Sequence, residues 1–272
     1  MLFFYPKGAD TIRKVTFTNE VNGLSVTFST DTPMMFLEKL DGCSCGSSAV
    51  TYKPLDFDGQ RFISSALNPR TIQLTINFGG RSGKLYSRSE ALKRWEEIQK
   101  TLVPGQMGTL TWTDGINSRF IRCRCGDLPL PTEILPFLFR AGFSLVADIP
   151  YWKDSAENVV DFGGSGSGEV VINNDCGIAV PVIIEVGSAD DIFLLANRTT
   201  GEALGFAEDL GEGFTIDTEN CTVTTDRGEL VNHKLLIDSS FFYLAPGENT
   251  LKFMDYTSGV VLRWRRAFMG VY

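Results

Sequence analysis

The chain has 272 residues but a single histidine, His233, so the usual base of nucleophilic catalysis is almost missing. Serine and cysteine nucleophiles commonly rely on a histidine to take their proton. His233 lies in the polar stretch ELVNHKLLIDSS, which favours a solvated turn over a catalytic role. The sequence also lacks a G-x-S-x-G motif, and the run GGSGSGE lacks the lysine of a phosphate-binding loop. We therefore assign no catalytic and no cofactor-binding residue.

Long apolar runs and an excess of positive charge are also missing. No stretch approaches the roughly 18 consecutive apolar residues that a membrane helix needs. The opening MLFFYPKG places apolar residues before the first positive charge and has no small-residue cleavage site, so we expect synthesis in a cytoplasm rather than secretion. Lys and Arg total 25 against 33 Asp and Glu, a net charge of −8, which argues against a nucleic-acid-reading face.

Carboxylates are plentiful, and glycoside hydrolysis needs only two of them. Acidic residues that are neighbours in the sequence and lie on turns are usually solvated, and no D-x-D-x-D-G calcium loop is present. A hydrolase therefore stays only a minor alternative, and we expect no enzyme. The candidate carboxylates are Asp190, Asp191, Glu208, Asp209, Asp217 and Glu219.

Six cysteines occur, and four of them form two C-x-C pairs, Cys43/Cys45 and Cys123/Cys125. On a strand, residues i and i+2 face the same way, so each pair can present two thiols together. Four thiolates suit zinc or an iron–sulfur cluster. The usual spacing is C-x₂-C, however, and nothing in the sequence brings the two pairs together. Small buried thiols are the preferred interpretation, and a metal site stays an alternative.

The first half of the chain alternates apolar and polar residues in the manner of strands. Asn22-Gly23 within 14–30 and Asp114-Gly115 within 108–126 predict two hairpins. Further strands are predicted at 71–78 and 137–148. The fold class expected here is α+β, because one helix interrupts these strands.

That helix is predicted over 87–105. Ser87 and Glu90 form a capping box, and Pro104-Gly105 ends the pattern. Apolar residues recur at helical spacing, which predicts that one face packs on a sheet. They are Ala91, Trp95, Ile98 and Leu102.

The second half is almost wholly β, with short strands separated by Gly, Asn and Asp turns. This spacing predicts an antiparallel β-sandwich over 169–272. Pro181 predicts an edge strand or a strand that begins after it. The Gly- and Ser-rich stretch 153–168 is expected to be a flexible linker joining this sandwich to an N-terminal domain over 1–152.

Taken in order, several segments resemble the distal tail proteins of phages with long non-contractile tails. FSLVADIPYWKD (143–154) resembles the end of that family's first domain, and the second domain is matched in order and spacing. The C-x-C pairs, and Ile149 between acid and proline, depart from the family pattern. The other segments are NGLSVTFST, EKLDG, YKPLDFDGQRFISSALNPRTIQLTINF, TLVPG, GTLTW, INNDCGIAVPVIIEVG, FFYLAPGENTLKF and VVLRWRRAFMGVY.

The resemblance implies a mainly β fold: a tail-tube-like barrel with one helix, and a galectin-like sandwich. It implies a structural virion protein at the tail tip, made in the bacterial host from a phage or prophage gene. It further implies that six copies form a ring between the tail-tube protein and the tail-tip protein, with receptor-binding or baseplate proteins held outside. By the same resemblance, we expect DNA to pass the channel without specific binding and no membrane to be entered.

A carbohydrate-binding module for host cell-wall glycan is the alternative function. Trp264, between Arg263 and Arg265, is the nearest candidate for a sugar platform. Its alternation with Leu262 favours a core position instead.

Overall fold

The structure is a computed structural model. Its one α-helix in the described part of the chain is too short and polar to cross a membrane. The residues described are 13–32, 35–43, 46–53, 58, 60–79, 88–163, 166–188, 193–206, 208, 210–256 and 258–271.

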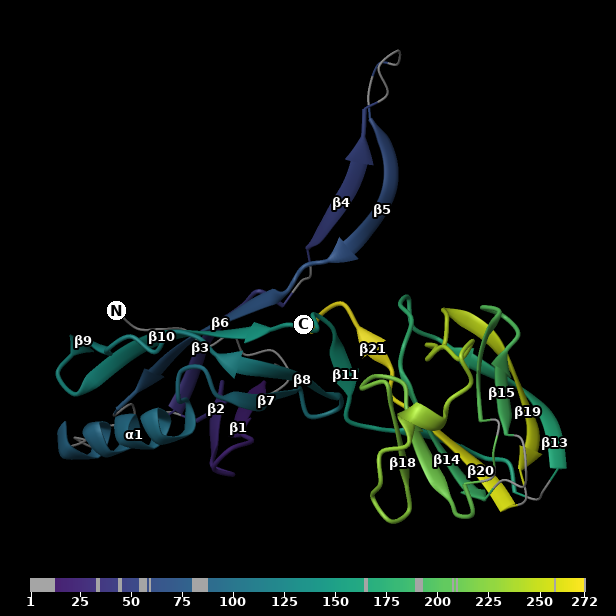
Figure 1. Cartoon of the computed structure of the whole chain (residues 1–272). Helices are drawn as coiled ribbons and strands as arrows, with labels where there is room; N and C mark the ends of the chain where they lie inside the picture. The colour runs from purple at the N-terminus through teal and green to yellow at the C-terminus, as the bar shows by residue number, and fades with distance from the viewer. Residues whose placement is uncertain are drawn as a thin grey trace. The chain divides into compact units, whose positions relative to one another are not determined.

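The chain divides into two compact units (Figure 1). Unit 1 comprises Met1–Lys153 together with Met269–Tyr272, and unit 2 comprises Asp154–Phe268. Both are built mainly of strands, so the predicted mainly β fold class is confirmed.

A closed barrel forms the body of unit 1. Its strands follow the order β8-β7-β1-β2-β3-β6-β10, and pairing of β10 with β8 closes the ring through Leu145↔Cys125 and Val146↔Arg124. Neighbouring barrel strands are antiparallel except β2 and β3, which meet in parallel at Ser29↔Phe36. The barrel strands are β1 (Lys14–Asn19), β2 (Ser25–Ser29), β3 (Met35–Asp41), β6 (Arg70–Phe78), β7 (Met107–Thr113), β8 (Ser118–Cys125) and β10 (Leu138–Ala147).

Two hairpins of the barrel lie at the positions that the turn residues in the sequence predict. β1 and β2 flank Asn22-Gly23, and β7 and β8 flank Asp114-Gly115. Gly23 has φ 72° and Gly115 has φ 90°, a region that glycine enters without a steric cost. Both predicted hairpins are therefore confirmed.

Alternating side chains fill the barrel, and helix α1 (Arg88–Thr101) packs on it. Trp95 stacks on Phe78 with ring centroids 5.7 Å apart. The buried amide of Asn19 also donates to the carbonyl of Thr101 at 2.9 Å, which ties the first hairpin to the helix. The predicted stripe of Ala91, Trp95, Ile98 and Leu102 is buried and thus confirmed, although the helix ends at Thr101. Ser87 of the predicted capping box lies outside the described residues.

Three further strands belong to the first part of the chain. β4 (Ser47–Tyr52) and β5 (Arg61–Leu67) form a separate two-stranded sheet, and β9 (Thr132–Leu135) pairs with the start of β10. β11 (Trp152–Asp154) spans the boundary between the two units.

Unit 2 is a sandwich of two antiparallel sheets with orders β12-β20-β14-β17-β18 and β13-β19-β15-β16. β14 begins directly after Pro181, as predicted. The sandwich strands are β12 (Asn158–Asp161), β13 (Gly166–Asn174), β14 (Val182–Ser188), β15 (Leu194–Asn197), β16 (Glu202–Gly205), β17 (Phe214–Asp217), β18 (Thr222–Thr225), β19 (Gly247–Tyr256) and β20 (Ser258–Trp264). The 3₁₀ turn η1 lies at Asn232–Lys234, and the short strand β21 (Ala267–Phe268) follows β20.

Phenylalanines fill much of the space between the two sheets. Phe214 packs edge-on against Phe193 and Phe206 at 5.2 and 5.3 Å, and all three side chains are buried. Edge-to-face contacts of this kind add to the free energy gained by burying the rings.

The expected flexible linker at 153–168 differs from the structure. β12 lies inside this stretch and pairs with β20, while β13 begins at Gly166 and pairs with β19. Phe162 also packs on Phe253, at 5.3 Å between centroids. Small residues predict flexibility only where no neighbouring strand supplies hydrogen-bond partners, and here two strands do so. Residues 269–272, expected in the sandwich, instead belong to unit 1.

Candidate assembly surfaces

A two-stranded arm, β4 and β5, extends from the barrel (Figure 1). Every residue of both strands is exposed, although Val50, Tyr52, Phe62, Ile63 and Leu67 are large and apolar. An isolated two-stranded hairpin is marginally stable in water. An apolar arm of this kind is suited to packing against another molecule.

The arm continues the β3–β6 hairpin beyond a sharp bend. Gly42 has φ 75°, and a side chain there would clash with the carbonyl of Thr71. On the return strand, the N–H of Asn68 donates to Gly46 at 3.0 Å, and the Asn68 side chain accepts from Ser48 at 2.6 Å. The base of the arm is therefore fixed by backbone geometry and local hydrogen bonds.

A second exposed apolar surface, the β9 edge, consists of β9 with Leu130 and Phe137. β9 is the last strand of its sheet in the described part of the chain, and all of its residues are exposed. Phe137 has φ 65°, which is unusual for a bulky residue. Its N–H donates to the Glu133 carboxylate at 3.1 Å, which helps to hold this turn. An edge strand presents unpaired backbone groups that a further strand can use.

The arm and the β9 edge lie at opposite ends of β6. The arm leaves β6 at Arg70, where β5 and β6 are nearly continuous in sequence. β9 pairs with β10 at 138–140, and Phe139 of β10 lies opposite Phe78 at the far end of β6. Nine residues of strand span about 30 Å. One copy therefore presents two apolar surfaces, one at each end of β6.

The base of the arm also holds the end of the chain. Arg70 is only 3% exposed, and it donates to the carbonyls of Cys43 and Met269 at 2.9 and 2.7 Å. Arg119 donates to the carbonyl of Gly270 at 2.9 Å. Two guanidinium groups thus fix residues 269–270 on unit 1.

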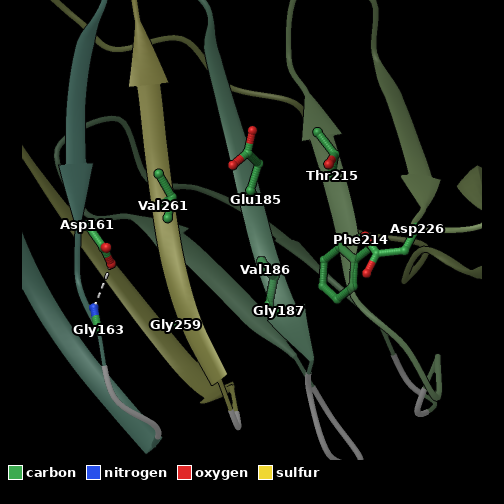
Figure 2. Close-up of a pocket in the computed structure, with 10 residues that line it drawn as sticks. All are labelled: Asp161, Gly163, Glu185, Val186, Gly187, Phe214, Thr215, Asp226, Gly259 and Val261. Carbon is green, nitrogen blue, oxygen red and sulfur yellow. Dashed lines mark hydrogen bonds between the residues drawn. The ribbon is translucent and has the colours of Figure 1, made fainter.

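Unit 2 carries an open hollow of about 540 Å³ on its five-stranded sheet (Figure 2). Glu185 lies beside Val261 and Thr215 on neighbouring strands and is bound by Arg263 at 3.0 and 3.2 Å. Three carboxylates contribute to the lining, and its aromatic residue, Phe214, is buried. The remaining lining residues are Asp161, Gly163, Val186, Gly187, Asp226 and Gly259.

The predicted thiol pairs show no metal-binding arrangement in the described residues. Cys123 and Cys125 are buried on one face of β8, where burial raises their pKa to about 12 and about 11. Burial also raises the pKa of Cys43, and Cys45 lies outside the described residues. Protonated thiols are poor metal ligands. No group of three or more His, Cys, Asp or Glu residues suited to a metal occurs in the part of the chain that the structure describes.

Among the other candidate residues that the structure describes, Asp217 and Glu219 share one turn, while Glu208, His233 and Trp264 belong to other segments. Asp217 accepts from the N–H groups of Glu219 and Asn220 and so serves a turn, while Glu208 binds Lys234 at 3.4 Å. Asp190, Asp191 and Asp209 lie outside the described residues. His233 is exposed on η1, and Trp264 is half-buried at the end of β20.

The sequence interpretation missed the arm and the β9 edge as surfaces. A signal for β9 was present, because Pro129, Pro131 and Pro136 surround it and proline favours edge strands. The arm carries a weaker signal, because neither SSAVTY nor RFISSAL alternates strictly between apolar and polar residues.

Comparison with known proteins finds a family match in unit 2. Residues 176–268 match the model of the siphovirus-type tail component, C-terminal domain. Most of the second unit is thus similar to this phage tail domain. The resemblance to distal tail proteins predicted from the sequence is thereby confirmed. A comparison with curated protein sequences finds no significant match.

Solved structures extend the likeness to nearly the whole chain. The Dit protein (gp 19.1) of phage SPP1, described as a hub of the adsorption apparatus in phages infecting Gram-positive bacteria, matches with a TM-score of 0.70. Identity is 16%, and 93% of this chain and 99% of that chain are covered. A chain of the phage P2 baseplate in its activated conformation with calcium matches with a TM-score of 0.54 and 10% identity, covering 96% and 99%. At these identities the likeness shows a shared fold.

Proposed function

We propose that the chain is a structural protein of a phage virion, the hub at the distal end of the tail. Six copies form a ring through their barrels and join the tail tube to the tip and host-adsorption apparatus. Two exposed surfaces at opposite ends of β6 carry this proposal, because a cyclic assembly of one chain requires two different, complementary surfaces on each copy.

The fold comparison supports the same role. The match covers 99% of SPP1 Dit, so nearly all of that hub protein has a structural counterpart here. We assign unit 1 to the ring and unit 2 to the holding of receptor-binding or baseplate proteins outside it. No enzymatic activity is proposed.

Passage of DNA through the ring is compatible with the charge of the chain. Binding to DNA gains free energy when cationic side chains displace counterions from phosphates. A net charge of −8 provides little of this attraction. The ring would let DNA pass without retaining it.

Carbohydrate binding, the alternative function, receives less support from unit 2. Sugar rings commonly stack on an exposed aromatic face. The hollow's Phe214 is buried, and Trp264 is half-buried at a strand end. Glycan arrays should therefore give no signal with the full chain, and a signal lost on Trp264→Ala would favour the alternative.

Negative-stain imaging of the purified protein tests the proposal. We expect rings with a central hole and six-fold symmetry, with one sandwich projecting from each copy. Particles without a hole, or rings of another symmetry, would contradict it.

A further inference from the structure

The geometry points to a head-to-tail contact in which the β4–β5 arm of one copy packs on the β9 edge of the next copy. The inference rests on the proposed function, because it names the two surfaces that would join neighbours in the ring. The partner is thus a second copy of this chain.

The arm carries apolar side chains on both faces. Paired residues of an antiparallel hairpin point to the same face, and successive pairs alternate between faces. Val50 pairs with Ser64, and after a bulge Thr51 pairs with Phe62. Val50 and Phe62 therefore lie on opposite faces of the arm. Such a hairpin gains most when it is enclosed by another protein surface.

The β9 edge complements the arm in its backbone chemistry. β9 is paired with β10 on one side, and it ends its sheet in the described part of the chain. Its outer N–H and C=O groups can be satisfied by the edge of an added strand. A β4–β5 hairpin has such an edge on each of its two strands. Strand addition would thus cover the apolar side chains of both surfaces.

Charge adds a second form of complementarity. β4 and β5 contain one charged residue, Arg61, and β9 contains one, Glu133. Otherwise both surfaces are apolar or uncharged polar. Because the two apolar surfaces carry opposite charges, contact between the arm and the β9 edge is favoured over contact of arm with arm or of edge with edge.

The position of the two surfaces excludes their meeting within one compact copy. They lie at opposite ends of β6, about 30 Å apart along the strand. An arm that reaches forward from one copy therefore meets the β9 edge of another. Each copy packs its arm on one neighbour and binds the arm of the other neighbour. These contacts close into a ring when the rotation between successive copies is a whole-number fraction of a full turn.

A complementation experiment with two variants of the full chain tests the contact. Phe62→Asp introduces a charge on the arm, and Leu135→Asp introduces one on the β9 edge. These side chains are 64% and 62% exposed, so both variants should fold as the wild type does. We expect self-association of each variant to weaken at least about tenfold. Mixed together, the intact arm of one should bind the intact edge of the other and yield a heterodimer that grows no further.

Native mass spectrometry of the separate and mixed variants distinguishes the outcomes. Ile237→Asp is the matched control, since Ile237 is 98% exposed in unit 2 and should not affect assembly. Rings from both single variants would overturn this contact and leave the hub proposal standing. Loss of rings without a heterodimer in the mixture would also overturn it. Wild-type protein that stays monomeric would contradict self-assembly of the hub itself.

Discussion

Arg70 and Met269 are separated by 199 residues in the sequence, yet a hydrogen bond of 2.7 Å joins the Arg70 guanidinium to the Met269 carbonyl. The same guanidinium donates to Cys43, which follows the bend at the base of the arm. One buried cation therefore links the start of β6, the base of the arm and the returning end of the chain.

Arg70→Met should lower the free energy of unfolding by about 2–3 kcal/mol, because two partly buried carbonyls lose a charged donor. Urea unfolding followed by tryptophan fluorescence measures this change. Arg122→Met is the control, because the Arg122–Glu20 pair is exposed and should contribute less than about 1 kcal/mol. Equal losses in the two variants would contradict the role given to Arg70.

Trp95→Ala should destabilise unit 1 by about 3–5 kcal/mol, since it removes a buried ring stacked on Phe78. Leu92→Ala on the exposed face of the same helix should change stability by less than about 0.5 kcal/mol. Thermal unfolding of both variants compares the two faces. A similar effect at the two positions would mean that the helix does not pack as described.

The buried thiols of β8 should resist alkylation at pH 8, whereas exposed Cys221 should react. Burial raises the pKa of Cys123 to about 12, so the folded protein keeps this thiol protonated. Its contribution to stability is complete below the ordinary pKa of 9.0 and is lost as the pH rises from there towards about 12. Peptide mass spectrometry after iodoacetamide treatment locates the label. Rapid labelling of Cys123 under native conditions would contradict its placement.

The β7–β8 turn should weaken in acid. N–H groups of Asn117 and Ile116 and the Asn117 side chain donate to Asp114 and lower its carboxyl pKa to about 2. Its contribution is therefore complete above the ordinary pKa of 3.8 and is lost as the pH falls through about 2. Asp114→Ala should lower the melting temperature at pH 7, and the difference from wild type should shrink at pH 2. A difference that is the same at both pH values would show that the carboxylate has no such role.

Charge reversal tests the proposed contact independently of its apolar residues. Arg61→Glu and Glu133→Arg should each weaken association about two- to fivefold, as expected for a partly exposed pair. The double variant should regain most of the loss, because the charges are exchanged. Sedimentation velocity gives the association constants. If the losses of association in the two single variants simply add in the double variant, the two residues do not contact each other and the proposed pairing is contradicted.

Local patterns in the sequence predicted the elements better than their connections. The turns at Asn22-Gly23 and Asp114-Gly115 and the stripe through Trp95 depend on neighbouring residues, and all three were predicted correctly. Closure of the barrel by Leu145 and Cys125, and the return of Met269 to Arg70, depend on contacts between distant segments. The expected linker failed for the same reason, because β19 and β20 supply its pairing partners. Exposure of the arm could not be predicted, since the sequence of a strand does not reveal which of its faces remain uncovered.

The mass of the wild-type protein in solution tests the central claim most directly. Light scattering behind size exclusion should be recorded over a concentration series up to about 200 µM, because mass action favours assembly. The hub account predicts a species with a mass close to six times 30.0 kDa. A mass of 30.0 kDa at every concentration would contradict a ring that forms through surfaces of this chain alone.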